Sequence, residues 1–461
     1  MFERETYVGR RSELADRLES GVVLLVGNGE SPMNYADNAY PFRQDSTFLY
    51  YFGLAQPDLA AVLDVETGEA TLFGDDVTMD QVVWTGPVPS VSERADRVGV
   101  SRTRGRADLD TVVDAARSSG RRIHYLPPYR AEHQVRLARL LDPGPAAVGE
   151  GASLELIRAV VAQRSHKDAE EVREIERAVA TSVAMHEASL RMVAPGVTEA
   201  AIAAEVERIP RAAGGRIAFP VIATIHGETL HNHGQAYTLG EGRLFLLDAG
   251  AETALGYAGD LTTTCPVAPR FDGRQREVYT VLLSAYETAV AALGPGVPYR
   301  DVHQEASWVI FEGLKDLGLA RGDTDEAVAA GAHALVFPHG LGHMMGLDVH
   351  DMENLGEDHV GYAGEERSTQ FGLDALRLAR RLEPGFVLTV EPGIYFIPRL
   401  IDEWRGRSQC AEFLDFDAFD AWRDFGGMRN EENYLITDDG AHRLGPRKPQ
   451  TPDELEAARG G

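Results

Sequence analysis

The sequence predicts an α+β fold in two domains: a smaller α/β domain over residues 1–155 and a larger α+β domain over residues 156–461. The first observation is length, because 461 residues are too many for one compact core of ordinary size. The second is a change of pattern, from short alternating strands and helices to long helices mixed with strands. The third is Asp142–Gly151, a segment rich in glycine and proline that is typical of a domain boundary.

The first domain is predicted from short apolar runs that are bounded by turn residues. Strands are expected at Gly21–Val26, Leu59–Val65, Thr71–Phe73 and Arg121–Leu126. A helix is expected at Tyr129–Leu141. Strands that alternate with helices in this way indicate an α/β arrangement.

The second domain begins with long helical patterns and continues with strands. Helices are expected at Ser165–Val193, Thr198–Ala213, Gly273–Ala292 and Tyr299–Leu317. Strands are expected at Leu244–Leu247, Asp260–Cys265, Val387–Val390 and Glu432–Thr437. This mixture predicts a sheet with helices on one face. The residues after Arg447 are expected to form a frayed tail.

The charge of the chain excludes some classes of partner. A formal net charge of −27 argues against nucleic acid and against anionic membranes. The lysines are Lys167, Lys315 and Lys448, so arginine carries almost all the positive charge. A GC-rich genome would explain this composition. The alternative hypothesis is adaptation to high salt, in which an acidic surface keeps the protein in solution.

A cytoplasmic location is predicted from features that are absent. No apolar run is long enough to span a membrane. The first residues are charged and patterned like an amphipathic helix, without the apolar stretch of a secretory signal. Cys265 and Cys410 are the only cysteines, so no disulfide framework is implied.

Five segments of the second domain place an acidic or imidazole group at or near the end of an apolar run. The residues are Asp248, Asp260, His343, Glu391 and Glu431. Each alone has an ordinary explanation, such as a turn cap, a hydrogen-bonded core histidine or an ion pair with arginine. Together they are mostly oxygen donors, which suit two divalent ions. Two such ions can hold a hydroxide between them as nucleophile and can polarise a carbonyl group.

The local sequences around these residues resemble a known family. The motifs are Asp248-Ala249-Gly250, Gly256-Tyr257-Ala258-Gly259-Asp260, His339-Gly340-Leu341-Gly342-His343, Thr389-Val390-Glu391-Pro392-Gly393 and Arg429-Asn430-Glu431. In this order they resemble the pita-bread metallopeptidases, and among these the chain is similar to aminopeptidase P and prolidase. Residues Asn38–Gly53 look like the N-terminal domain that these Xaa-Pro peptidases carry. The resemblance implies a pita-bread domain preceded by that smaller domain.

The resemblance also implies a role for each of the five residues. Asp248 would chelate one ion, and Asp260 and Glu431 would bridge both. His343 and Glu391 would complete the shell of the second ion, and Glu391 would accept the proton of the bridging water. Manganese is the ion that the family usually holds, with cobalt or zinc as substitutes.

Three histidines are expected to act on the substrate. By analogy with the family, His231, His339 and His350 would bind substrate, stabilise the tetrahedral intermediate and transfer protons. The leaving group is a proline nitrogen, which must be protonated as it departs. His233 competes with His231 for its role, but His231 has the family-like spacing of 17 residues before Asp248.

Two arginines complete the predicted site. Arg429 is expected to orient the bridging carboxylates. Arg377 aligns with a prolidase arginine that binds the carboxylate of a dipeptide, a role that suits the guanidinium fork. An exposed helix residue is the alternative for Arg377. The chain departs from the family pattern at Asn430, where isoleucine is usual.

The expected function is hydrolysis of the bond between an N-terminal residue and a following proline in small peptides. A dipeptidase that accepts only Xaa-Pro is the nearest alternative. A metal-free hydrolase resembling creatinase, or a non-catalytic scaffold on the same fold, would not need all five donor residues. A homodimer or homotetramer is expected, in which the first domain helps to wall the active site of a neighbour.

Overall fold

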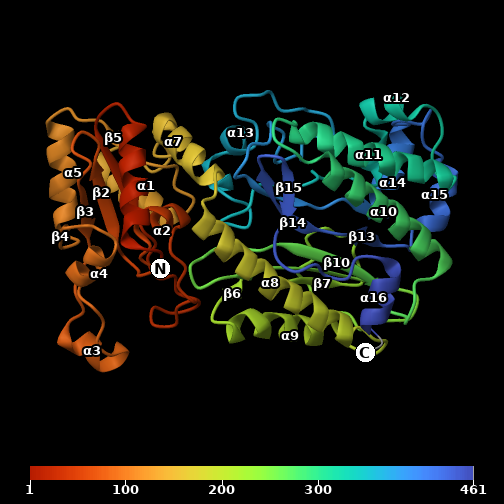
Figure 1. Ribbon diagram of the computed structural model, residues 1–461, viewed down its shortest axis with the longest axis horizontal. Coiled ribbons are helices and arrows are strands. Elements are labelled where there is room, and N and C mark those ends of the chain that lie inside the picture. The colour runs from red at the N-terminus through yellow and green to blue at the C-terminus, as the bar shows by residue number, and fades with distance from the viewer. Residues whose placement is uncertain (460–461) are drawn as a thin grey trace. The chain divides into compact units, whose positions relative to one another are not determined.

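A computed structural model describes residues 1–459, and these residues form two compact units (Figure 1). Unit 1 comprises Met1–Arg164 with Asn354–His359, and unit 2 comprises Ser165–Glu353 with Val360–Gly461. The units divide inside the helix α7 (Leu154–Ser165), and the predicted boundary after residue 155 stays a prediction. Of the helices in residues 1–459, none is long and apolar enough to cross a membrane.

Unit 1 is built on one mixed sheet in the order β4-β3-β2-β1-β5. The strands are β1 (Val22–Val26), β2 (Ala60–Asp64), β3 (Ala70–Phe73), β4 (Arg102–Arg104) and β5 (Ile123–His124). Strands β1, β2 and β3 pair antiparallel, whereas β1–β5 and β3–β4 are parallel. The predicted strands of this domain are therefore all present, with the last one shortened to two residues.

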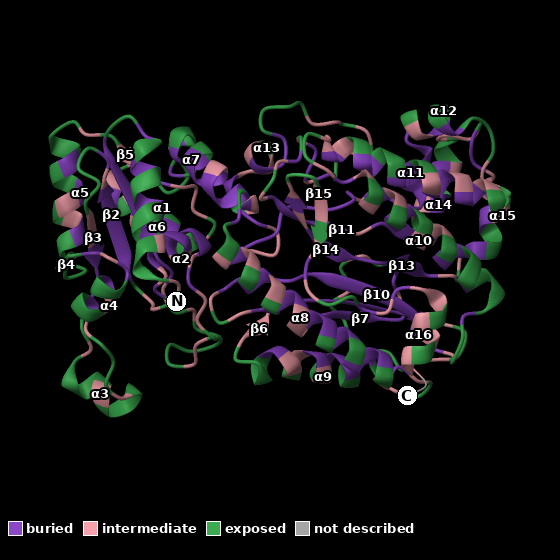
Figure 2. Ribbon diagram, viewed as in Figure 1, coloured by how far each residue is buried: buried purple, intermediate pink, exposed green. Residues whose placement is uncertain are grey.

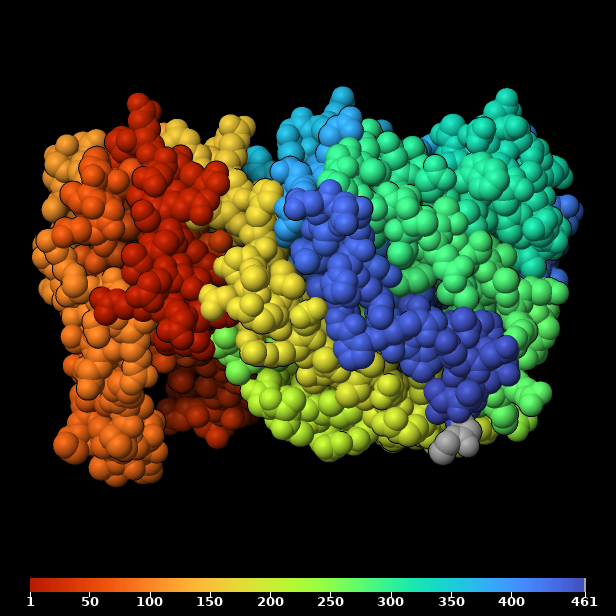
Figure 3. All heavy atoms as spheres, viewed as in Figure 1, coloured from red at the N-terminus to blue at the C-terminus, as the bar shows by residue number. Residues whose placement is uncertain are grey.

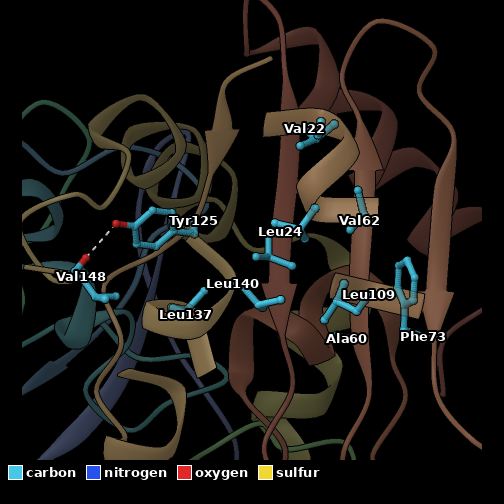
Figure 4. Close-up of a cluster of buried hydrophobic side chains, with 12 residues drawn as sticks. Val22, Leu24, Ala60, Val62, Phe73, Leu109, Tyr125, Leu137, Leu140 and Val148 are labelled. Carbon is cyan, nitrogen blue, oxygen red and sulfur yellow. Dashed lines mark hydrogen bonds between the residues drawn. The ribbon is translucent and has the colours of Figure 1, made fainter. Parts of the chain in front are cut away.

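Helices cover the sheet of unit 1 and close its apolar core (Figure 4). The helices of unit 1 are α1 (Arg4–Asp16), α2 (Ser46–Phe52), α3 (Met79–Thr85), α4 (Val91–Arg97), α5 (Asp108–Ser118), α6 (Ala131–Leu141) and α7, of which α3 projects from the unit and buries no residue (Figure 1). Leu24 and Val62 from the strands pack with Leu109 of α5 and Leu137 of α6. Burial of such side chains is the main source of stability in a domain of this size.

Unit 2 contains two helix pairs that are joined in the same way. The first pair is α8 (Ala169–Met192) and α9 (Glu199–Ala212), and the second is α10 (Gly273–Ala292) and α11 (Tyr299–Asp316). Each pair is connected through a Pro-Gly turn, with Gly196 at φ 90° and Gly296 at φ 82°. A positive φ is easily adopted by glycine, so both turns can reverse the chain sharply.

The strands of unit 2 form small sheets between these helix pairs. Three-stranded sheets have the orders β10-β8-β7 and β11-β14-β15, and β12–β13 and β6–β9 form two-stranded pairs. The strands are β6 (Arg216–Ile217), β7 (Ile222–Thr224), β8 (Leu244–Ala249), β9 (Ala251–Glu252), β10 (Leu261–Pro266), β11 (Val387–Val390), β12 (Gly393–Tyr395), β13 (Gly427–Arg429), β14 (Glu432–Thr437) and β15 (Gly440–Arg443). Helix α8 packs on β8, β9 and β10, while α10 packs on β11, β12 and β13.

Strand β13 lies against both β8 and β10, so it joins the two halves of unit 2. The ends of β8, β11 and β13 and the start of β10 therefore lie within one region of unit 2.

The remaining helices are α12 (Thr324–Ala329), η1 (Ala332–Leu335), η2 (Glu353–Leu355), α13 (Glu357–Val360), α14 (Pro398–Arg407), α15 (Phe416–Phe419), η3 (Asp420–Trp422) and α16 (Pro452–Arg459).

The expectation of a frayed tail after Arg447 is wrong. The last described segment is the helix α16, which packs against α8. Leu455 is fully buried, and Arg459 donates hydrogen bonds to the carbonyl oxygens of Val193 and Val267. Burial of Leu455 and the hydrogen bonds of Arg459 therefore hold this segment in place, although its polar composition is typical of a disordered terminus.

Candidate metal centre and active site

The five predicted donor residues meet in one buried place, which we call the floor: Asp248, Asp260, His343, Glu391 and Glu431. Asp248 belongs to β8, and Asp260 immediately precedes β10. Glu391 follows β11, and Glu431 lies between β13 and β14. His343 is fixed to β11, because its N–H donates to Thr389 Oγ1 and its carbonyl accepts from the Thr389 N–H. Strand ends therefore bring together residues that are far apart in the sequence.

The donor atoms of the floor converge. His343 Nε2 lies 3.4 Å from Asp260 Oδ2 and 3.4 Å from Glu391 Oε1. One donor atom each from Asp260, His343 and Glu431 lie within 4.8 Å of one another. The Nδ1 hydrogen of His343 is donated to the Met344 carbonyl oxygen at 3.0 Å. This fixes the tautomer, so the Nε2 lone pair faces the acidic groups as in a metal-binding histidine.

The carboxylates of the floor lie in a setting that disfavours their negative charge. Burial raises the pKa of Asp260 to about 8 and that of Glu391 to about 7, and it raises the pKa of Glu431 well above its usual range. Neighbouring carboxylates add to the shift for Asp260 and Glu431. Among the described residues, Asp260 Oδ1 and Glu431 Oε1 have no hydrogen-bond partner although both are buried.

Buried carboxylate oxygens without partners are costly unless they bind a metal or are protonated. The donors are carboxylates and one imidazole, a set that suits divalent ions. The residues present therefore fit a dinuclear metal site.

The guanidinium group of Arg429 supports the floor through hydrogen bonds. Its Nη2 donates to Asp248 Oδ2 at 2.5 Å, its Nε to Thr262 Oγ1 at 3.0 Å and its Nη1 to the Tyr395 hydroxyl at 2.9 Å. Thr262 donates in turn to Glu431 Oε2 at 2.7 Å. The guanidinium is fully buried, so these charge-assisted hydrogen bonds fix the carboxylates firmly.

Tyr395 extends this network to His339. The two side chains meet at 2.9 Å between the Tyr395 hydroxyl and His339 Nε2. His339 donates its Nδ1 hydrogen to the carbonyl of the next residue, so Nε2 accepts from the tyrosine. Burial, followed by the charge of Arg429, lowers the pKa of His339 to about 3, and the ring is neutral at pH 7.

All ten predicted site residues line one cavity of about 560 Å³ in unit 2. They are His231, Asp248, Asp260, His339, His343, His350, Arg377, Glu391, Arg429 and Glu431. Phe219, Pro220, Ile222 and Leu230 supply an apolar part of the wall. His233 lines the same cavity, and its ring lies 6.2 Å from that of His231, so position does not separate these two histidines.

A second group, which we call the rim, consists of His350, Glu353 and Arg377. His350 Nδ1 lies 2.8 Å from Glu353 Oε2, and Arg377 forms an ion pair with Glu353 Oε1. All three side chains are about one-third exposed. The His350 ring lies 4.1 Å from that of His343, so the rim adjoins the floor. Burial lowers the pKa of His350 to about 3, with a further contribution from His343.

The turn that carries the rim is anchored in the interior. Lys167 Nζ donates to Asp351 Oδ2 at 3.0 Å, and both side chains are 1% exposed. Met352 is fully buried and adopts a left-handed conformation with φ 61°. Asp351 and Met352 lie between His350 and Glu353 in the sequence. Because both are buried and held in place, His350 and Glu353 have defined positions.

Asn430, which departs from the family pattern, has a buried partner. Its Oδ1 accepts from Lys448 Nζ at 2.8 Å, and Lys448 lies 3.6 Å from Glu432 Oε1. The side chains of Lys448 and Glu432 are 0% exposed. The side-chain oxygen of Asn430, the residue next to Glu431 in the sequence, is therefore satisfied by the buried ammonium group of Lys448.

The sequence patterns did not point to Thr262, Tyr395 or Glu353. Thr262 and Tyr395 lie in strands next to the predicted ligands Asp260 and Glu391. Each is an even number of residues from its ligand, and this spacing was the signal available in the sequence. Glu353 lies three residues after His350, and an acidic residue so near a functional histidine was its signal.

Comparison with known proteins agrees with this geometry. The sequence profile of metallopeptidase family M24 matches residues 173–438, and that of the aminopeptidase P N-terminal domain matches residues 7–124. A Xaa-Pro dipeptidase from Homo sapiens is 30% identical over 98% of this chain and 92% of its own length. A Xaa-Pro aminopeptidase from Escherichia coli is 29% identical over 99% of this chain and 98% of its own length.

Solved structures confirm the predicted fold. Aminopeptidase PepP from Pseudomonas aeruginosa superposes with a TM-score of 0.82 at 27% identity, covering 100% of this chain and 98% of that one. Zinc-substituted aminopeptidase P from Escherichia coli, in complex with product, gives a TM-score of 0.81 at 27% identity, with coverage of 99% and 98%. The chain belongs to metallopeptidase family M24, with the pita-bread fold and an aminopeptidase P type N-terminal domain.

Proposed function

We propose that this protein is a Xaa-Pro aminopeptidase, which removes the N-terminal residue from peptides that have proline in second place. The observation that carries the proposal is the convergence of Asp260 Oδ1 and Glu431 Oε1, two buried atoms with no hydrogen-bond partner in the described part of the chain, with Nε2 of His343. The similarity to a Xaa-Pro aminopeptidase over nearly the whole chain supports the choice of substrate.

We assign the five floor residues to two divalent ions, with manganese as the ion used and cobalt or zinc as substitutes. Asp248 would hold one ion, Asp260 and Glu431 would be shared by both, and His343 and Glu391 would complete the set of ligands around the other ion. When bound, such a pair of ions activates water and polarises the scissile carbonyl group.

The protein's own groups hold the substrate and move its protons. Glu391 Oε1 accepts a hydrogen bond from Thr389 Oγ1 at 3.2 Å and is placed to take up the proton of the attacking water. In this role Glu391 would accept the proton and then return it to the proline nitrogen, which must be protonated as it departs. His231, His339 and His350 line the cavity and would position the substrate backbone and transfer protons.

A dipeptidase that cleaves Xaa-Pro alone is the second candidate. It is favoured by Arg377, a cation on the cavity wall that could bind a terminal carboxylate. The similarity to the human Xaa-Pro dipeptidase points the same way.

The experiment that tests the proposal is hydrolysis of Gly-Pro-Ala and of Gly-Pro by the purified chain. We expect release of glycine from Gly-Pro-Ala with manganese, loss of activity with a chelator and recovery when manganese is restored. Cleavage of Gly-Pro alone would favour the dipeptidase. No metal-dependent cleavage of either peptide would refute both.

We also propose that the chain self-associates as a homodimer or homotetramer through α3 of unit 1. This helix has no buried residue and projects from the rest of unit 1 (Figures 2 and 3). Trp84 is 87% exposed, and Met79 and Val83 are about three-quarters exposed. A capping box of Thr78 and Gln81 keeps the helix folded despite its exposure. Apolar side chains gathered on a projecting helix are typical of an interaction surface.

Light scattering tests this part of the proposal. Wild type should have the mass of two or four chains, and Trp84→Ser with Val83→Ser should shift the equilibrium toward a monomer. A wild type that is monomeric at micromolar concentration would contradict it. A cytoplasmic location, supported by two unpaired cysteines, completes the proposal.

A further inference from the structure

The rim holds a carboxylate where a substrate carboxylate would have to bind. Arg377 and Arg429 are the arginines among the described residues that line the cavity. Arg429 is fully buried and engaged with Asp248, Thr262 and Tyr395 beneath the floor. Arg377 is therefore the cation that remains for an incoming anion, and it already forms an ion pair with Glu353.

From this arrangement we infer that Glu353 determines substrate length by occupying Arg377 and so disfavouring dipeptides. The inference rests on the proposed function and names the substrate class of the same site. A Xaa-Pro dipeptide carries its carboxylate directly on the proline. To reach Arg377, that carboxylate must displace Glu353 or lie beside it, and two carboxylates on one guanidinium repel each other.

A longer peptide avoids this repulsion. At the same position it has a neutral amide, whose carbonyl oxygen can accept a hydrogen bond from Arg377 while Glu353 remains in place. The Glu353 carboxylate is also held by His350 Nδ1 at 2.8 Å, and its turn is anchored by the buried Lys167–Asp351 pair. Glu353 is therefore not free to swing away without loss of these contacts.

The test uses two substrates that differ in one charge, Gly-Pro and Gly-Pro amide. The measured quantity is the ratio of their kcat/KM values. In Glu353→Gln the side chain keeps its shape and can still accept from His350, but its charge is removed. The ratio should rise by about tenfold or more in favour of Gly-Pro, the effect of one charge-assisted hydrogen bond.

Arg377→Gln provides an independent reading. Because Glu353 already neutralises Arg377 in the wild type, this change alone should alter the ratio by less than about threefold. In the double variant the gain seen with Glu353→Gln should disappear. A large loss of Gly-Pro cleavage with Arg377→Gln alone would show that Arg377 binds the dipeptide in the wild type, and would overturn the inference.

Glu383→Gln is the matched control. Glu383 lies between an arginine and a histidine in the same way, with Arg380 at 2.7 Å and His166 at 3.2 Å, and it does not line the cavity. Its removal should leave the ratio unchanged. An equal rise in this control, or an unchanged ratio in Glu353→Gln, would overturn the inference alone. A wild type that cleaves neither Gly-Pro amide nor Gly-Pro-Ala would refute the proposed function and the inference together.

Discussion

The floor and the rim lie side by side in one cavity, but they are built differently. Floor residues lie in or directly beside strands, and all but Glu391 are less than 10% exposed. The rim residues are about one-third exposed; His350 and Arg377 lie in irregular segments, and Glu353 begins the short helix η2. In the floor, Asp260 Oδ1 and Glu431 Oε1 have no hydrogen-bond partner among residues 1–459, whereas in the rim Glu353 is paired with both His350 and Arg377. We infer that the floor supplies the chemistry of the reaction and the rim selects the substrate.

Asp260→Asn is the strongest test of the floor. Loss of the carboxylate that we propose is shared by the two ions should reduce kcat/KM for Gly-Pro-Ala by more than about a thousandfold. The metal-free variant should be at least as stable as metal-free wild type, because a buried carboxylate without a partner is removed. Thermal melts with and without manganese check this: metal should raise the Tm of wild type more than that of the variant.

If the metal-induced rise in Tm of Asp260→Asn equals that of wild type, Asp260 does not contribute to metal binding. Glu353→Gln is the comparison within the rim. It should keep both the metal-induced rise in Tm and cleavage of Gly-Pro-Ala.

Arg429→Met tests the support beneath the floor. Removal of its hydrogen bonds to Asp248, Thr262 and Tyr395 should reduce metal affinity or activity by about 10- to 100-fold. Titration of the metal-free protein with manganese, followed by activity, measures both. Arg429→Lys should recover only part of the loss, since an ammonium group cannot reproduce the fork. Wild-type affinity in Arg429→Met would mean that the floor does not depend on this residue.

How much of this arrangement the sequence could predict differs between the two regions. Every floor residue except His343 lies in a strand or directly beside the end of one, and strands such as Val387–Val390 and Glu432–Thr437 were predicted with the bounds they have. Strand pairing then determines where the donors meet. The contact between Glu353 and Arg377 depends on the path of loops, which carry no periodic pattern.

Other parts of the fold were missed for a similar reason. The helix α16 is short and polar, and it is stabilised by tertiary contacts of Leu455 and Arg459 that no local pattern reveals. The helix predicted at Ser165–Val193 begins later, at Ala169, because Asp168 caps it by accepting from the N–H groups of Glu170 and Glu171. The contacts of α16 are tertiary and override local propensity, whereas the capping box of Asp168 and Glu171 is a local signal that the sequence does contain.

The scaffold behind the floor should be sensitive to acid. His186 lies against the strands of the floor, with Nδ1 2.8 Å from Thr263 Oγ1 and Nε2 3.0 Å from the Ala249 carbonyl oxygen. Burial, followed by the charge of Lys448, lowers its pKa to about 3. The unfolded chain therefore binds a proton at pH values where the folded protein does not.

The free energy of unfolding should fall as pH drops from about 6.5 toward 3, by up to about 1.4 kcal/mol per unit from this residue. Urea titrations at several pH values measure the slope. His186→Gln should flatten it by the contribution of one proton. An identical slope in the variant would show that His186 is not the group that titrates.

Salt tests the difference between the surface and the interior. Lys167 and Lys448 are fully buried in ion pairs, so the outside of the molecule is nearly free of lysine while the net charge is −27. Screening of this charge should raise the Tm by several degrees in molar potassium chloride. An unchanged Tm would count against adaptation to high salt and in favour of genome composition.

The measurement that tests the central claim most directly is the number of manganese ions bound per chain, by equilibrium dialysis of the metal-free protein. We predict two ions per wild-type chain and fewer in Asp260→Asn. We also predict two in Glu353→Gln, because the rim does not hold metal. Binding of no ion by wild type, or of two ions by Asp260→Asn with wild-type affinity, would contradict the assignment of the floor as the dinuclear centre.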